Sequence, residues 1–137
     1  MILIDTNVFS ELVKPRPEAC VVDWLFQHRR ETLLSTIVIA ELSVGIRTTR
    51  GQAKRALLFP WLNRLIERHE GRIAQFDVEA AKSWGELASS LILTGERSGH
   101  FDSMLAAQGL ALGVPIATRN IRDFERSGVS LIDPWAA

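Results

Sequence analysis

The sequence lacks the features that mark several common classes of protein. Its single cysteine, Cys20, excludes an intrachain disulfide, and this fits a reducing cytoplasm. Lysine plus arginine and aspartate plus glutamate each number 16, so the net charge is zero. Proteins that bind nucleic acid through charge alone usually carry a basic excess. Contact with nucleic acid would therefore need a metal ion or a partner that supplies positive charge locally.

Membrane segments and several catalytic motifs are also missing. The apolar run Met1–Ile4 does not have the form of a signal peptide, and the uncharged run Leu33–Ala40 is far shorter than a membrane span. There is no glycine-rich phosphate loop and no nucleophile elbow, and the three histidines lack metal-ligand spacing. We therefore expect a soluble cytoplasmic protein without membrane contact.

The elements that are present indicate one compact α/β domain. The chain has 137 residues, of which 47% are hydrophobic, so we predict a single domain over residues 1–137 with a sizeable core. Short apolar runs alternate with helical patterns, which is typical of a parallel sheet covered by helices on both faces. Five strands are predicted, at Met1–Ile4, Glu31–Ser35, Ile73–Phe76, Val114–Thr118 and Val129–Ile132.

Helices are predicted between these strands. Thr6 or Asn7 is expected to cap a short first helix, and Pro17 is expected to open the next one. Pro60 should bend or break a long basic helix over Gly51–Glu70. The remaining helices are predicted at Val38–Thr48, Val78–Leu93 and Phe101–Leu112.

Three isolated carboxylates are the most informative feature of the sequence. Asp5 follows the first strand, Glu41 lies in the helix after the second, and Asp102 lies near the start of a later helix. Each is the only acid of a segment that should be largely buried, and none has a lysine or arginine in the same segment. A buried carboxylate is costly unless it is hydrogen-bonded, paired or bound to a cation.

The three acids are expected to converge on one crevice. In an open parallel sheet, the strand C-termini and the N-termini of the following helices share one edge. The fourth strand also ends there, in Thr118-Arg119-Asn120, with Asp123 three residues further on. Oxygen ligands without Cys or paired His select a hard cation, Mg²⁺ or Mn²⁺. The pattern predicts metal-dependent hydrolysis or phosphoryl transfer, with one or two ions.

Structural roles for the same acids remain open on the sequence alone. Asp5 or Asn7 is suited to cap a helix, and Asp102 is suited to the first turn of one, where it would meet the helix dipole. Glu41 has no comparable structural role. Because the three positions coincide on one edge, we favour the site over three separate structural explanations.

Four motifs and the C-terminal segment resemble the PIN-domain nucleases, in the order and over the length of that family. The four motifs are Met1–Asn7, Ser35–Gly45 with Glu41, Phe101–Ala107 with Asp102, and Ala117–Asn120 followed by Asp123-Phe124. The ending Ile132-Asp133-Pro134-Trp135 is similar to the tail of the FitB and VapC branch.

This resemblance implies a fold and a biological setting. The family has a five-stranded parallel sheet flanked by helices. Its VapC members are toxins of type II toxin–antitoxin pairs and act as Mg- or Mn-dependent endoribonucleases. Their antitoxin is a small DNA-binding protein, so that such a toxin meets DNA only through the antitoxin, and the toxins commonly form homodimers.

The resemblance also assigns roles to residues. Metal-binding and catalytic acids would be Asp5, Glu41 and Asp102, and the supporting hydrogen-bonding residues would be Thr6, Asn7 and Thr118. Many members carry an aspartate where this chain has Asn120, whose amide oxygen binds a metal or its water without adding charge. Either Asn120 completes the metal site or Asp123 supplies the missing catalytic charge, and we expect a single bound ion.

In the family, the helices that match 17–28 and 53–70 form a groove for the antitoxin. Both helices in this chain carry many bulky apolar residues, including Trp24, Trp61 and Leu65. We therefore expect an apolar groove between them that leads to the acids.

Two functions of other classes compete with a nuclease. A non-catalytic binding module would act with its antitoxin as a DNA-bound repressor, although the intact set of acids favours an enzyme. A phosphatase or phospho-acceptor domain also places a carboxylate after its first strand. That alternative is weakened because Asp5-Thr6-Asn7 holds no second acid and no lysine follows the fourth strand.

Overall fold

The fold is a parallel sheet between two layers of helices, shown by a computed structural model that describes residues 1–96 and 99–137. The strands are β1 (Ile2–Ile4), β2 (Thr32–Ser35), β3 (Ile73–Ala74), β4 (Ile116–Ala117) and β5 (Leu131–Ile132). The helices are α1 (Thr6–Glu11), α2 (Ala19–Gln27), α3 (Thr36–Thr48), α4 (Gln52–Arg68), α5 (Val78–Leu93), α6 (His100–Leu112) and α7 (Ile121–Phe124), with 3-10 turns η1 (Glu125–Ser127) and η2 (Pro134–Ala136).

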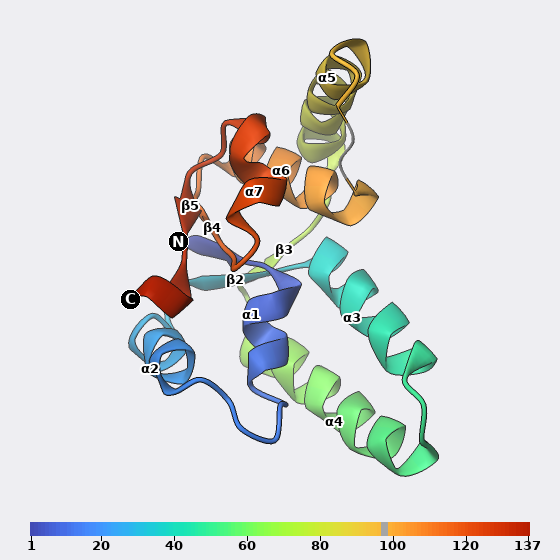
Figure 1. The fold of residues 1–137 in the computed structure, drawn as a ribbon, viewed down its shortest axis with the longest axis vertical. Helices are drawn as coiled ribbons and strands as arrows, with labels where there is room; N and C mark the ends of the chain where they lie inside the picture. The colour runs from blue at the N-terminus through green and yellow to red at the C-terminus, as the bar shows by residue number, and fades with distance from the viewer. Residues whose placement is uncertain (97–98) are drawn as a thin grey trace.

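The five strands pair in the order β3-β2-β1-β4-β5, and every pair is parallel. In Figure 1, α1 to α4 lie below the sheet, and α5, α6 and α7 lie above it. This arrangement confirms the predicted α/β fold with a five-stranded parallel sheet flanked by helices. Within the described ranges, no helix combines the length and hydropathy that a membrane span requires.

The strand order reverses direction at β1, and this reversal positions the candidate site. The chain moves from β1 outward through β2 to β3, then crosses to β4 on the other side of β1. Loops that leave neighbouring strands in opposite directions open a crevice at their C-terminal ends, where open α/β sheets bind ligands. Asp5 follows β1 and Thr118 follows β4, so both stand at this crevice.

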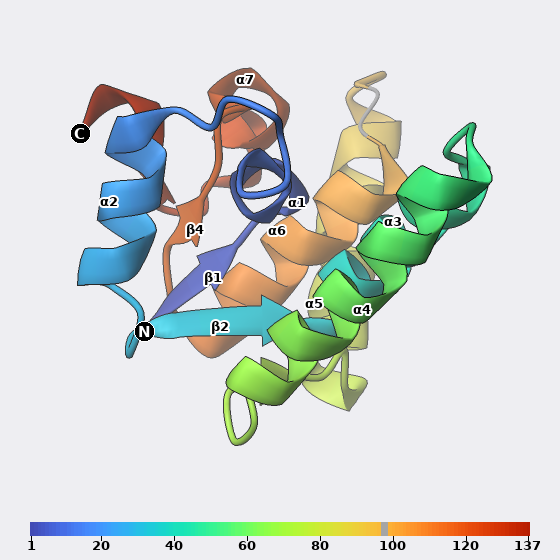
Figure 2. The ribbon, with the colours of Figure 1, turned by 90° about the horizontal axis from the view of Figure 1, so that it is seen from below.

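The core lies on both faces of the central strands. Leu3 and Ile4 of β1 and Ile116 of β4 are completely buried, as expected for parallel strands covered on both sides. Figure 2 shows α3 and α4 lying side by side on one of these faces. At the end of the chain, η2 packs on α2, where Cys20 Sγ lies 3.8 Å from the carbonyl oxygen of Trp135.

Helix α6 approaches the sheet very closely at Gly109. A Cβ atom on this residue would lie 3.0 Å from Val129 Cγ2 and 3.2 Å from two side-chain atoms of Ile116. These neighbours are themselves buried. Glycine therefore allows the helix that carries Asp102 to sit directly on β4.

Three local predictions were wrong. The N-cap of α1 is Asp5, which accepts a hydrogen bond from the backbone N–H of Thr6, so neither Thr6 nor Asn7 takes that position. The alternative that Asp5 caps a helix is thereby confirmed. Helix α2 begins at Ala19 rather than at Pro17. The break offered at Pro60 is absent, since α4 runs through this residue and packing against the core stabilises the turns on either side.

Candidate active site

An open cleft of about 390 Å³ lies at the C-terminal edge of the sheet. It is lined by Asp5, Thr6, Asn7, Ser10, Glu41, Asp102 and Asn120. These residues come from the β1–α1 junction, α3, α6 and the loop after β4. The structure thus brings together the three acids that the sequence singled out, over a separation of about a hundred residues.

Asp5 is held rigidly at the base of this cleft. Its side chain is 2% exposed. One carboxylate oxygen accepts from the backbone N–H of Thr6 at 2.7 Å, and the other accepts from Thr118 Oγ1 at 2.7 Å and from Asn7 Nδ2 at 3.1 Å. Burial raises the pKa of Asp5, and these three hydrogen bonds offset part of that rise.

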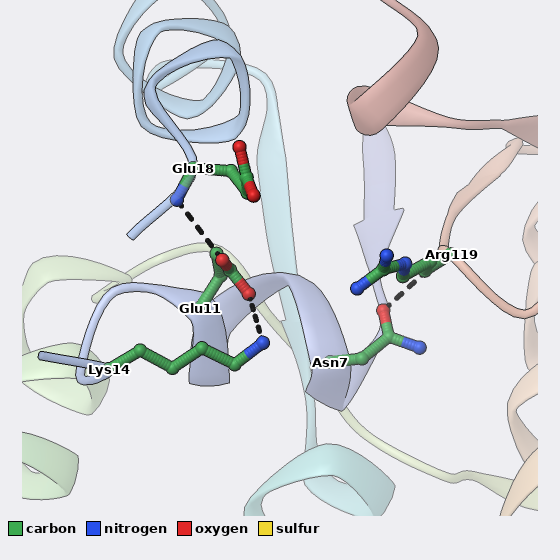
Figure 3. A network of polar contacts seen from close by, with 5 residues as sticks. All are labelled: Asn7, Glu11, Lys14, Glu18 and Arg119. Atoms are coloured by element: carbon green, nitrogen blue, oxygen red, sulfur yellow. Dashed lines mark hydrogen bonds and ion pairs between the residues drawn. The ribbon is translucent and has the colours of Figure 1, made fainter. Parts of the chain in front are cut away.

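Asn7 connects Asp5 to the loop that follows β4. Its Oδ1 accepts from the backbone N–H of Arg119 at 3.2 Å, as Figure 3 shows. This contact leaves Nδ2 to face Asp5 and Thr118 Oγ1. The Thr118 hydroxyl also accepts from the backbone N–H of Asn120 at 3.0 Å. The supporting residues therefore tie the two strand ends at the crevice into one network.

Asp102 lies in the first turn of α6 and is half-buried. Burial, together with the negative charges of Asp5, Glu41 and Asp123, raises the pKa of Asp102 to about 6. Glu41, on α3, is also half-buried. Among residues 1–96 and 99–137, none of the three cleft acids forms an ion pair with a lysine or arginine. The cleft therefore concentrates negative charge that the described part of the chain leaves uncompensated.

The structure places Asn120 and Asp123, the two candidate site residues after β4, in different surroundings. Asn120 lines the cleft, although it is exposed. Asp123 is an exposed residue of α7 and lines a neighbouring cavity with Gly99 and Ser103. Its charge nevertheless contributes to the raised pKa of Asp102.

The residues of the cleft fit a hard divalent cation. All candidate donors are oxygens, and the pKa of Asp102 is raised first by burial and then by repulsion from neighbouring acids, a repulsion that a cation would relieve. Thr6 Oγ1 is buried beside the same cleft without a hydrogen-bond partner in the described ranges. Among the described residues, no three His, Cys, Asp or Glu side chains already form a closed metal cluster. Mg²⁺ does not need a closed cluster of protein ligands, because one or two carboxylates and several waters commonly hold it.

One buried acid escaped the sequence analysis. Glu11 is 2% exposed at the end of α1. It forms an ion pair with Lys14 at 2.6 Å and accepts from the backbone N–H of Glu18 at 3.1 Å (Figure 3). The Lys14 interaction, followed by the Glu18 hydrogen bond, lowers the pKa of Glu11. Because Lys14 stands three residues away, Glu11 did not look isolated in the sequence. It fixes the turn between α1 and α2.

The predicted apolar groove is present between the two expected helices, but the prediction that it leads to the acids is wrong. A cavity of about 520 Å³ lies between α2 and α4, with Leu25 and Leu65 among its lining residues. It shares no lining residue with the acidic cleft, so it does not lead directly to the acids. A separate groove lined by α1, α3 and α4 reaches the cleft through Thr6 and Ser10.

Comparisons with known proteins agree with this geometry. The family model described as PIN domain matches residues 2–129. The chain is 36% identical to VapC ribonuclease Y4jK of Sinorhizobium fredii, over 98% of each chain. It superposes on the crystal structure of FitAcB from Neisseria gonorrhoeae with a TM-score of 0.90 and 31% identity over 100% of each chain. It superposes on FitAB bound to an IR36 DNA fragment with a TM-score of 0.87 and 30% identity, over 98% of this chain and 96% of that one.

Proposed function

Because the chain belongs to the PIN-domain family, we propose that it is the toxin of a type II toxin–antitoxin pair and a metal-dependent endoribonuclease of the cytoplasm. One observation carries this proposal: Asp5, Glu41 and Asp102 meet in a single cleft at the crevice of the sheet. The name of the relative from Sinorhizobium fredii, a VapC ribonuclease, supports RNA as the substrate.

The cleft would hydrolyse a phosphodiester by in-line attack of water. Asp5, Glu41 and Asp102, with the Asn120 amide oxygen, would hold Mg²⁺ or Mn²⁺, which when bound activates a water and neutralises phosphate charge. Thr118, Asn7 and the Thr6 backbone keep the Asp5 carboxylate in one orientation. A cleft carboxylate would accept the proton of the attacking water while the bond from phosphorus to the leaving oxygen breaks.

The test is cleavage of single-stranded RNA by purified protein in three conditions: with Mg²⁺ or Mn²⁺, with a chelator, and after the metal is restored. We expect cleavage only when the metal is present. Asp5→Asn serves as the control, because it keeps the size of the side chain but removes its charge. Equal cleavage by wild type and Asp5→Asn would show that a contaminating nuclease is responsible.

A non-catalytic binding module remains the alternative. Arrest of growth on expression of the wild-type chain alone, but not of Asp5→Asn, would support the nuclease. A harmless wild type that still binds its partner would favour the repressor function.

The proposed partner is a small DNA-binding antitoxin, which would bring the toxin to DNA, and the proposed toxin unit is a homodimer. A solved structure similar to this chain is named as FitAB bound to a DNA fragment, which supports such a complex.

We assign the antitoxin segment to the cavity between α2 and α4. Apolar side chains line this cavity together with four arginines, Arg29, Arg30, Arg68 and Arg72. Within the described ranges, none of these arginines forms an ion pair, so the cavity suits an apolar segment with acidic side chains.

Phe26→Ala is expected to weaken antitoxin binding at least tenfold, an estimate of about 1.4 kcal/mol for one lost aromatic anchor. Phe26 lines this cavity and is 65% exposed. The Arg29 guanidinium carbon lies 4.3 Å from the centre of its ring. The measurement is titration calorimetry with purified antitoxin. Val78→Ala is the matched control, since Val78 is 71% exposed at the start of α5. Equal affinities for both variants would place the antitoxin elsewhere.

A further inference from the structure

A buried glutamine joins the helices that carry two of the cleft acids. Gln108 lies on α6 and is 1% exposed. Its Oε1 accepts from Ser35 Oγ at 2.5 Å, and its Nε2 donates to the carbonyl oxygen of Ala74 at 2.9 Å. One side chain therefore links α6 to the ends of β2 and β3. Neither the sequence motifs nor the proposed chemistry accounts for it.

Ser35 makes this link relevant to the position of α3. Ser35 is completely buried and is the N-cap of α3, where its Oγ accepts from the backbone N–H of Ile37 at 3.0 Å. A hydroxyl has a single proton, and Ser35 donates it to Gln108. The start of the helix that carries Glu41 is thus fixed by a hydrogen bond that Ser35 donates to α6.

The residues that Gln108 contacts lie in the same row across the sheet as Asp5. Leu3 pairs with Leu33, so the same register places Asp5 beside Ser35, and Ser35 in turn pairs with Ala74. Gln108 bonds to the last two members of this row.

The contact between Ser35 and Gln108 lies at the same distance along each helix from the acid that the helix carries. Glu41 follows Ser35 by six residues and Asp102 precedes Gln108 by six, which is about 9 Å along each helix axis. Helix α3 packs against α6, so rotation or sliding at this link would change the separation of the two carboxylates.

We propose that Gln108 is a positioning residue that holds α3 and α6 in the arrangement that Glu41 and Asp102 need to bind a divalent cation. This inference rests on the proposed function, because it assumes a metal site in the cleft. An amide is required at this position, since it accepts from a hydroxyl and donates to a carbonyl at the same time. Glutamate lacks the donor, and an apolar side chain leaves both buried partners unpaired.

The test compares Gln108→Met with a matched control at the other end of β2. Methionine keeps the length of the side chain and removes both hydrogen bonds. The control is Thr32→Val, since Thr32 is 3% exposed and its hydroxyl bonds to His69 Nε2 at 3.0 Å and accepts from Arg72 at 2.9 Å, away from the cleft. Both changes remove buried hydrogen bonds of β2, so both are expected to lower the melting temperature.

The two variants are expected to differ in Mn²⁺ binding, measured by titration calorimetry below their melting temperatures. Gln108→Met should raise the Kd for Mn²⁺ about tenfold, the scale seen for groups that orient metal ligands. Thr32→Val should leave Kd within about twofold, since it does not touch α3 or α6 near the acids. Ser35→Ala, which removes the donor to Gln108, should behave like Gln108→Met and replaces it if that variant does not fold.

Other outcomes overturn the inference. An unchanged Kd for Mn²⁺ in folded Gln108→Met would make this glutamine a purely structural residue, even if RNA cleavage fell. If the Kd for Mn²⁺ rose equally in Thr32→Val, the rise in Gln108→Met would be explained by general destabilisation. If the wild type binds no Mn²⁺, the metal site itself is refuted. If the wild type binds Mn²⁺ and cleaves RNA, the proposed function stands whether or not Gln108→Met changes the Kd.

Discussion

Replacing Asp102 by asparagine is expected to reduce RNA cleavage by about a hundredfold or more, while it makes the metal-free protein more stable at pH 7. Activity falls because one of the three charges that face the cation is lost. Stability rises because the same charge is half-buried beside Asp5 and Glu41, which repel it when no cation is present.

The sign of the stability change follows from the pKa. The pKa of Asp102 is 3.8 in a free side chain and about 6 in the folded protein. Between these values the folded state binds more protons than the unfolded state, so the free energy of unfolding falls as pH rises from about 4 to about 6. Since the carboxyl is only half-buried, solvent screens part of the effect, and we expect about 1–2 kcal/mol for Asp102→Asn at pH 7.

The measurement is urea unfolding in chelator at pH 4.5 and pH 7. Burial lowers the pKa of His69 from its usual 6.5, which makes the free energy of unfolding rise with pH below that value, so each variant must be compared with wild type at the same pH. Asp23→Asn is the control, because Asp23 is exposed on α2 and does not line the cleft. A loss of stability in Asp102→Asn at pH 7 would mean that Asp102 is chiefly a residue that caps and stabilises α6.

Replacing Gly109 by valine is expected to lower the free energy of unfolding by about 3 kcal/mol, the upper range for overpacking a core. The new Cβ would stand 3.0 Å from Val129 Cγ2 and 3.2 Å from two side-chain atoms of Ile116, and valine adds two methyl groups to it. Because both neighbours are buried, α6 must move away from β4. The measurement is urea unfolding of the purified variant.

Gly85→Val separates this steric effect from helix propensity. Gly85 lies inside α5, and a Cβ there would meet nothing within 4 Å. Valine is a somewhat better helix former than glycine, so this variant should match wild type within about 0.5 kcal/mol. Similar losses in both variants would contradict the close approach of α6 to the sheet.

The order of the elements was accessible from the sequence because its signals are local. Apolar runs such as Met1–Ile4 and the helical periodicity of Val78–Leu93 do not depend on distant residues. Parallel topology then places strand ends at one edge, which is sufficient to bring Asp5, Glu41 and Asp102 to a common crevice. The isolated acids were visible because no basic residue in their own segments compensates them.

Packing between distant segments decided the rest. The path of the loop after β4 directs Asn120, rather than Asp123, into the cleft, and the network through Asn7 and Thr118 depends on contacts across more than a hundred residues. The same holds for Gln108, which looks like an ordinary helix residue until α6 is laid against β2 and β3. Periodicity specifies which face of a helix is buried, but the partner of a buried polar group is specified only when two elements meet.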